Sequence, residues 1–149
     1  MAQGPGGPAL TLPQFIFQTP DGHAFANADL PHDRGWLFAF FDPTCDHCQR
    51  AARKMDDSAG LYTIMNVYIV STAPIPQLQA FVRKYAPHLK ARLLSDPDAR
   101  NMLKFHPQRY PAIFLYAPDQ HLLEYEDNPD TIYRIHNNLA AWRRMHSHG

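Results

Sequence analysis

The sequence predicts an α/β fold with a central mixed sheet and helices on both faces. Residues 36–41 are apolar at every position, which is typical of a strand buried on both sides. Strand-like and helix-like segments alternate after it, and such alternation predicts a mostly parallel sheet. The length of 149 residues and the hydrophobic content of 45% suit one domain with a sizeable core.

The N-terminal part predicts a short tail and a hairpin. Residues 1–10 are rich in glycine and proline, so we expect a flexible segment there and a single domain over residues 11–149. Residues 15–17 and 23–25 are extended candidates on either side of the turn sequence Thr19-Pro20-Asp21-Gly22. They predict a β-hairpin at an edge of the sheet.

A helix is expected directly after the apolar strand. Asp42 or Thr44 can serve as N-cap, and Pro43 suits a first helical position. Cysteine, alanine and methionine then recur at spacings of three and four, while charged residues take the other faces. Both cysteines of the chain, Cys45 and Cys48, fall in the first turn of this helix.

The remaining segments complete the alternation. We expect strands at 62–70, 91–94, 112–116 and 121–125, and helices at 74–85, 97–105 and 130–145. Asp96 is the natural cap of the helix at 97–105. The turn sequence Ala117-Pro118-Asp119-Gln120 joins the last two strands as an antiparallel hairpin.

The bulk properties limit the classes of partner. Lysine plus arginine and aspartate plus glutamate both number 14, so no net charge draws the molecule to nucleic acid or to an anionic membrane. The apolar runs are far shorter than the roughly 18 residues that suggest a membrane span. No signal peptide is visible, and the start resembles a mature exported protein without its leader. We expect a monomer in the periplasm or cell envelope rather than in the cytoplasm.

The two cysteines carry the clearest chemical signal. They form a C-x-x-C pair at a helix start, where unpaired N–H groups and the helix dipole stabilise a thiolate on Cys45. Cys48 lies one turn deeper, close enough to attack a mixed disulfide formed by Cys45. A zinc half-site and two inert core cysteines are the alternatives. No second ligand pair has recognisable zinc spacing, and Gln49 after Cys48 removes the C-x-x-C-H haem signature.

The segment Phe38-Ala39-Phe40-Phe41-Asp42-Pro43-Thr44-Cys45-Asp46-His47-Cys48-Gln49 resembles the active-site segment of the thioredoxin-like superfamily. Arg109-Tyr110-Pro111-Ala112-Ile113-Phe114 resembles the segment where that superfamily carries a cis-proline facing the dithiol. The chain between Cys48 and Pro111 is long enough for an extra strand and helix at 91–105, and in this it resembles the TlpA/ResA-like branch. The resemblance implies a thioredoxin-like fold with this insertion, and substrate contacts at Tyr110, Pro111 and Thr44.

The same resemblance implies how the dithiol is tuned. His47 stands where disulfide-forming members carry a histidine that stabilises the thiolate, and Asp46 adds an opposing negative charge. Two positions that carry a buried acidic residue in the superfamily are Ala39 and Ala51 in this chain.

We therefore expect a thiol–disulfide oxidoreductase that exchanges a Cys45–Cys48 disulfide with protein thiols or disulfides. It would use a redox recycling partner and neither an organic cofactor nor a metal. Two alternatives stay open, a copper-binding or copper-delivery module using both cysteines and a histidine, and a non-catalytic interaction module of the same fold.

Overall fold

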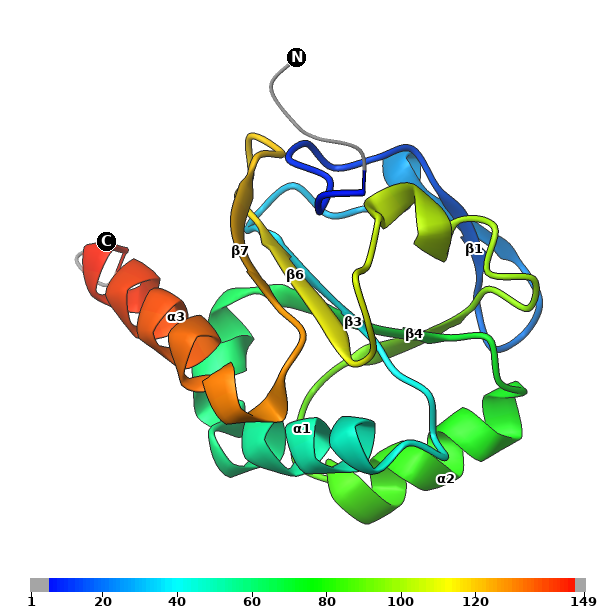
Figure 1. Cartoon of the computed structure of the whole chain (residues 1–149). Helices are drawn as coiled ribbons and strands as arrows, with labels where there is room; N and C mark the ends of the chain where they lie inside the picture. The colour runs from blue at the N-terminus through cyan, green and yellow to red at the C-terminus, as the bar shows by residue number, and fades with distance from the viewer. Residues whose placement is uncertain (1–5, 147–149) are drawn as a thin grey trace.

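The computed structural model describes residues 6–146, which form one seven-stranded sheet with helices packed against it (Figure 1). The strand order is β2-β1-β5-β4-β3-β6-β7. The strands are β1 (Ile16–Gln18), β2 (Ala24–Ala26), β3 (Trp36–Phe40), β4 (Asn66–Ser71), β5 (Arg92–Ser95), β6 (Ala112–Tyr116) and β7 (Leu122–Glu126). The α-helices are α1 (Asp46–Asp57), α2 (Ile75–Tyr85) and α3 (Tyr133–Met145). The 3-10 helices are η1 (Asn27–Asp29), η2 (Ala59–Ile64), η3 (Met102–Phe105) and η4 (Pro129–Thr131).

Strand β3 is the centre of the sheet. It pairs in parallel with β4 and antiparallel with β6, and all five of its residues are buried. Strands β3, β4 and β5 are parallel to one another, while the β1–β2 hairpin and the β6–β7 hairpin add antiparallel edges. The α/β class, the mixed sheet and the N-terminal hairpin at one edge are confirmed.

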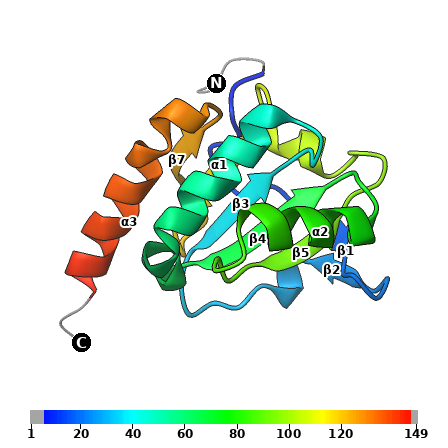
Figure 2. The same cartoon turned by 90° about the horizontal axis from the view of Figure 1, so that it is seen from below.

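The alternating side chains of the sheet divide the core in two. On one face Leu37 and Ala39 pack with residues of α1, α2 and α3. On the other face Phe38 and Phe40 pack with the N-terminal hairpin and with Phe105 of η3. Figure 2 shows α1 and α2 in front of the sheet and α3 beside β7. The described α-helices therefore share one face. The expectation of helices on both faces is met only by the 3-10 helix η3, which covers the second face together with side chains of the N-terminal hairpin.

Two expected elements are shorter in the structure. The strand expected at 62–70 begins only at Asn66, because β3 offers its first partner there, and the preceding residues form η2. The helix expected at 97–105 is reduced to η3. Ala99 adopts a left-handed backbone with φ 60°, which interrupts any helix from Pro97. The expectation that Asp96 is the N-cap residue is wrong, because η3 begins after Asn101; its carboxylate instead reaches forward to accept the N–H groups of Asn101 and Met102 at 2.9 and 2.7 Å.

The segment before β1 is attached to the domain over part of its length. The N–H of Ala9 donates to the carbonyl of Phe105 at 3.0 Å, and the N–H of Leu122 donates to that of Leu10 at 2.8 Å. The predicted flexible segment is therefore too long at its C-terminal end. Residues 1–5 of that segment lie outside the described residues. Among the residues that are described, no helix has the length and apolar character needed to cross a bilayer.

Strand β7 and helix α3 enclose a pair of carboxyl groups. Glu126 is buried, and Glu124 accepts a hydrogen bond from Asn138 of α3 at 2.8 Å. Burial, followed by the hydrogen bond and the charge of Glu126, raises the pKa of Glu124 to about 7, although Asn138 and Arg134 act in the opposite direction. Near pH 7 the pair consequently holds part of a proton.

Replacing Gly35 with alanine is expected to destabilise the fold by about 1–3 kcal/mol. A Cβ at Gly35 would clash with the carbonyl oxygen of Tyr116 and lie 2.9 Å from the sulfur of Met65. Urea unfolding measures the change. Gly60→Ala is the control, because nothing lies within 4 Å of its Cβ position. Equal stability of the two variants would contradict the close approach at Gly35.

Replacing Glu124 with glutamine should flatten one part of the pH dependence of stability. A raised pKa in the folded state means that the stabilising contribution is complete below the ordinary value of 4.5 and is lost as the pH rises through about 7. The introduced amide cannot ionise, so Glu124→Gln should gain stability relative to the wild type between about pH 5 and pH 8. Urea unfolding across this range tests it, and a pH-independent difference would refute the assignment.

Candidate active site

The two cysteines lie where the chain leaves the C-terminal end of β3 and enters α1. The helix begins at Asp46, and Cys45 is its N-cap residue, with an extended backbone at φ −92° and ψ 125°. The expectation that Asp42 or Thr44 caps this helix is wrong. Instead, Oδ1 of Asp42 accepts the N–H and the hydroxyl of Thr44 at 3.0 and 2.9 Å, which folds a turn ahead of the helix.

The two thiols have unequal surroundings. Cys45 is partly exposed, whereas Cys48 is fully buried. The N–H of Asp42 donates to Sγ of Cys48 at 3.3 Å. Burial raises the pKa of the Cys48 thiol to about 12, with Cys45 and Asp42 adding to the rise and the Asp42 N–H opposing it. At neutral pH the buried thiol therefore keeps its proton.

Cys48 packs in an apolar part of the core. Ala39 of β3 and Ala51 of α1 are fully buried and belong with Cys48 to the helix-side core. Neither position supplies a carboxyl group that could accept a proton from Cys48. Across the sheet, Ala39 of β3 pairs with Ile113 of β6, and Ile113 pairs with Glu126 of β7. The buried carboxyl group of Glu126 is therefore two strands away from Ala39.

Tyr110 and Pro111 precede β6 beside the dithiol segment. Ala112 pairs with Phe40, so Pro111 lies next to the stretch that leads from β3 to Cys45. The Tyr110–Pro111 peptide bond is cis, Pro111 is buried, and Tyr110 is 37% exposed. Burial, together with the nearby Asp96 and Cys48, raises the pKa of the Tyr110 hydroxyl. The structure thus brings Tyr110 into the vicinity of Cys48.

Asp96 has structural contacts beyond the capping role that the sequence indicates. Its side chain is buried at 2% exposure, and its N–H donates to the carbonyl of Ser71 at 2.9 Å. Only a capping role is expected from the sequence. The charge of Asp96 also raises the pKa of Tyr110, an effect between separate segments that no local pattern predicts.

The remaining expected site residues lie at the rim. Thr44, Asp46 and His47 are exposed. Within residues 6–146 the side chains of Asp46 and His47 make no hydrogen bond to either cysteine. In the same part of the chain, no three or more histidine, cysteine, aspartate or glutamate side chains are grouped so that they could hold a metal ion.

The chain is similar to known proteins in family and in fold. The family model for the AhpC/TSA family matches residues 8–124. No curated protein sequence gives a significant match. Many solved structures do match, and three of them illustrate the range of similarity.

A secreted Mycobacterium tuberculosis disulfide oxidoreductase, described as homologous to E. coli DsbE, is 24% identical with a TM-score of 0.68, covering 86% of this chain and 96% of its own. DsbF of M. tuberculosis is 26% identical with a TM-score of 0.67, covering 87% and 99%. Peroxidoxin BcpB of M. tuberculosis is 17% identical with a TM-score of 0.71, covering 92% and 96%.

These structures share the mixed sheet and its helices with the present chain. The fold is therefore the thioredoxin-like α/β fold. Since the family model covers most of the sequence, the chain belongs to the AhpC/TSA family within the thioredoxin-like superfamily.

Proposed function

We propose that the protein is a thiol–disulfide oxidoreductase in which Cys45 attacks and Cys48 resolves. The observation that carries this proposal is the asymmetry of the two thiols at the start of α1. A partly exposed thiol at a helix N-terminus can meet a substrate and be stabilised as a thiolate. A buried thiol three residues later can react only with its neighbour. Family membership and the fold support redox chemistry of this kind.

The reaction has two exchanges. The Cys45 thiolate attacks one sulfur of a substrate disulfide, a mixed disulfide forms, and the other substrate sulfur leaves as a thiolate. Cys48 then loses its proton and attacks the sulfur of Cys45. The Cys45–Cys48 disulfide forms, the second substrate thiolate leaves, and the substrate has gained two electrons. The reverse sequence oxidises a dithiol.

Deprotonation of Cys48 is the demanding step. Its raised pKa means that the proton must pass to an acceptor as the new sulfur–sulfur bond forms. The departing substrate thiolate is itself such an acceptor. Ala39 and Ala51, which belong to the same core cluster as Cys48, offer no carboxylate for this transfer.

The substrate side of the site lies along Tyr110 and Pro111. Pro111 cannot donate a hydrogen bond, so the backbone of Tyr110 is the main-chain group that would pair with an extended substrate segment. Thr44 directly precedes Cys45 and would also contact the substrate, while His47 and Asp46 would tune the thiolate. The substrates would be protein thiols or disulfides, and a separate redox partner would recycle the pair. Similarity to a secreted oxidoreductase supports a periplasmic or envelope location.

The alternative of a copper-binding or copper-delivery module is not favoured. One experiment distinguishes an oxidoreductase from a non-catalytic interaction module. The reduced protein is mixed with a peptide that contains one disulfide, and release of peptide thiols is followed over repeated turnovers with a reductant. We expect catalysis by the wild type and none by Cys45→Ser. Turnover that survives in Cys45→Ser would remove the dithiol from the mechanism.

Replacing Cys48 with serine should trap substrates. The variant keeps the attacking thiol but cannot complete the second exchange, so mixed disulfides through Cys45 should accumulate. Non-reducing gels followed by mass spectrometry identify the joined cysteine. Cys45→Ser is the matched variant and should form almost no mixed disulfide, because Cys48 is buried. Equal trapping by the two variants would reverse or void the role assignment.

Replacing His47 should make the pair more reducing. The reduction potential is expected at about −180 to −230 mV, since His47 and the helix N-terminus favour the thiolate while Asp46 opposes it. His47→Ala should lower the potential by roughly 30 mV for each tenfold loss of preference for the reduced form. Asp46→Asn should raise it. Equilibration with glutathione measures all three proteins, and a potential below about −270 mV that neither change affects would leave both residues without a tuning role.

A further inference from the structure

A cavity lies at the end of the sheet opposite the dithiol, where the parallel strands begin. The parallel strands β3, β4 and β5 begin at Trp36, Asn66 and Arg92, whereas Cys45 follows the other end of β3. An open cavity of about 590 Å³ is lined by residues at and before these strand starts. Small-molecule sites commonly have volumes of this size. None of the residues assigned to the dithiol site lines it.

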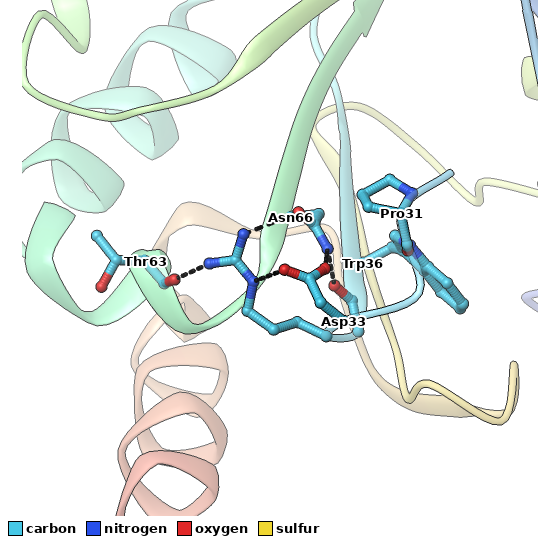
Figure 3. A network of polar contacts seen from close by, with 7 residues as sticks. Pro31, Asp33, Trp36, Thr63 and Asn66 are labelled. Atoms are coloured by element: carbon cyan, nitrogen blue, oxygen red, sulfur yellow. Dashed lines mark hydrogen bonds and ion pairs between the residues drawn. The ribbon is translucent and has the colours of Figure 1, made fainter. Parts of the chain in front are cut away.

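Three cationic side chains line this cavity: Arg34, Lys90 and Arg92. The guanidinium of Arg34 is fixed in place, because it donates to the carbonyl of Thr63 at 2.5 Å, to Asn66 at 3.1 Å and to Asp33 at 3.2 Å. Figure 3 shows this network of polar contacts, to which Asp33, Thr63 and Asn66 belong. Asp33 also accepts a hydrogen bond from Asn66 at 3.2 Å, so the one nearby carboxylate of the network is already engaged.

The other two cations are not neutralised. Within residues 6–146, the side chains of Lys90 and Arg92 form no ion pair and no hydrogen bond. The guanidinium of Arg92 lies over the ring of Phe25, 4.8 Å from its centroid, which orients the group without balancing its charge. After Arg34 is paired with Asp33, two positive charges at the cavity remain unmatched.

Tyr68 supplies a polar group that lacks a protein partner. It is only 1% exposed and stacks on Phe38 with ring centroids 5.3 Å apart, and it is the register partner of Arg92 in the neighbouring strand. Among the described residues none forms a hydrogen bond with its hydroxyl, yet Tyr68 lines the cavity. Burial raises the pKa of this hydroxyl, so it stays protonated and can donate. Because the hydroxyl is unpartnered and Tyr68 lines the cavity, it can donate a hydrogen bond to a molecule bound there.

We propose that this cavity binds a small organic anion. Its carboxylate or phosphate group would accept hydrogen bonds from Tyr68, Lys90 and Arg92, and such charge-assisted bonds are the strong ones. Its apolar part would contact Met65, Val67 and Leu89, which belong to the apolar portion of the lining. The site is independent of the dithiol chemistry, since it lies at the opposite ends of the strands.

The test is a titration of the isotopically labelled full chain, followed by nuclear magnetic resonance at low salt. The probes are benzoate, phenyl phosphate and, as the neutral control, benzyl alcohol. We expect saturable shifts at Tyr68, Lys90 and Arg92 with at least one anion, below about 10 mM. Tighter binding of benzoate would assign a carboxylate ligand, and tighter binding of phenyl phosphate would assign a phosphoryl ligand. Both results support the site.

Three variants separate the site from general charge effects. Tyr68→Phe keeps the ring stacking and should weaken binding about tenfold through loss of one hydrogen bond to a charged group. Lys90→Gln should also weaken it. Arg100→Gln removes a cation that does not line this cavity and should leave binding unchanged. No saturable shift with either anion, an equal response to benzyl alcohol, or equal weakening by Arg100→Gln would overturn the proposal.

Discussion

The burial of β3 on both faces is the constraint on which the rest of the structure depends. Its side chains alternate between two separate cores, so the strand needs cover on each side. Its pairing with β4 and β6 then fixes where Asn66 and Ala112 stand relative to it. The dithiol at one end of the strand and the cationic cavity at the other are both placed by this pairing. The two sites are consequently separated by the length of the sheet.

The turn at Asp42 links the fold to the chemistry. One side-chain oxygen of Asp42 holds Thr44, its carbonyl accepts the N–H of Cys45, and its own N–H points to the sulfur of Cys48. Cys45 is thereby left as the N-cap residue, in reach of solvent, while Cys48 faces the core. A single residue outside the C-x-x-C motif thus contacts both halves of the dithiol segment.

Local patterns predicted those elements whose signal is contained in a few neighbouring residues. The uninterrupted apolar run at β3, the turn at Thr19–Gly22 and the helical stripe of α2 are of this kind. The start of α1 was misplaced because Asp42, Thr44 and Cys45 compete for one cap, and only the three-dimensional turn decides between them. The left-handed conformation of Ala99 has no sequence signal, since alanine rarely adopts it.

For the candidate sites too, the sequence indicates the parts that are contiguous in the chain and not those assembled from distant segments. The cysteines and the Tyr110–Pro111 segment are readable because each is a short motif. The cavity at the strand starts is not, since Arg34, Tyr68 and Arg92 come from three separate segments and no spacing joins them. The influence of the Asp96 charge on the pKa of Tyr110 has no sequence signal for the same reason.

The N-terminal segment also bears on how the molecule behaves among its own copies. Strand β7 ends the sheet, and its outer backbone groups could pair with another chain. Leu10 and Thr11 lie against its beginning, through the bond from Leu122 and a bridge to His121, and the N–H of Leu12 donates to Gln120 at 2.9 Å. This strap occupies the hydrogen-bonding groups where β7 begins, and the opposite edge is only the three residues of β2. An edge strand whose backbone groups are already bonded offers fewer positions to the edge strand of another molecule.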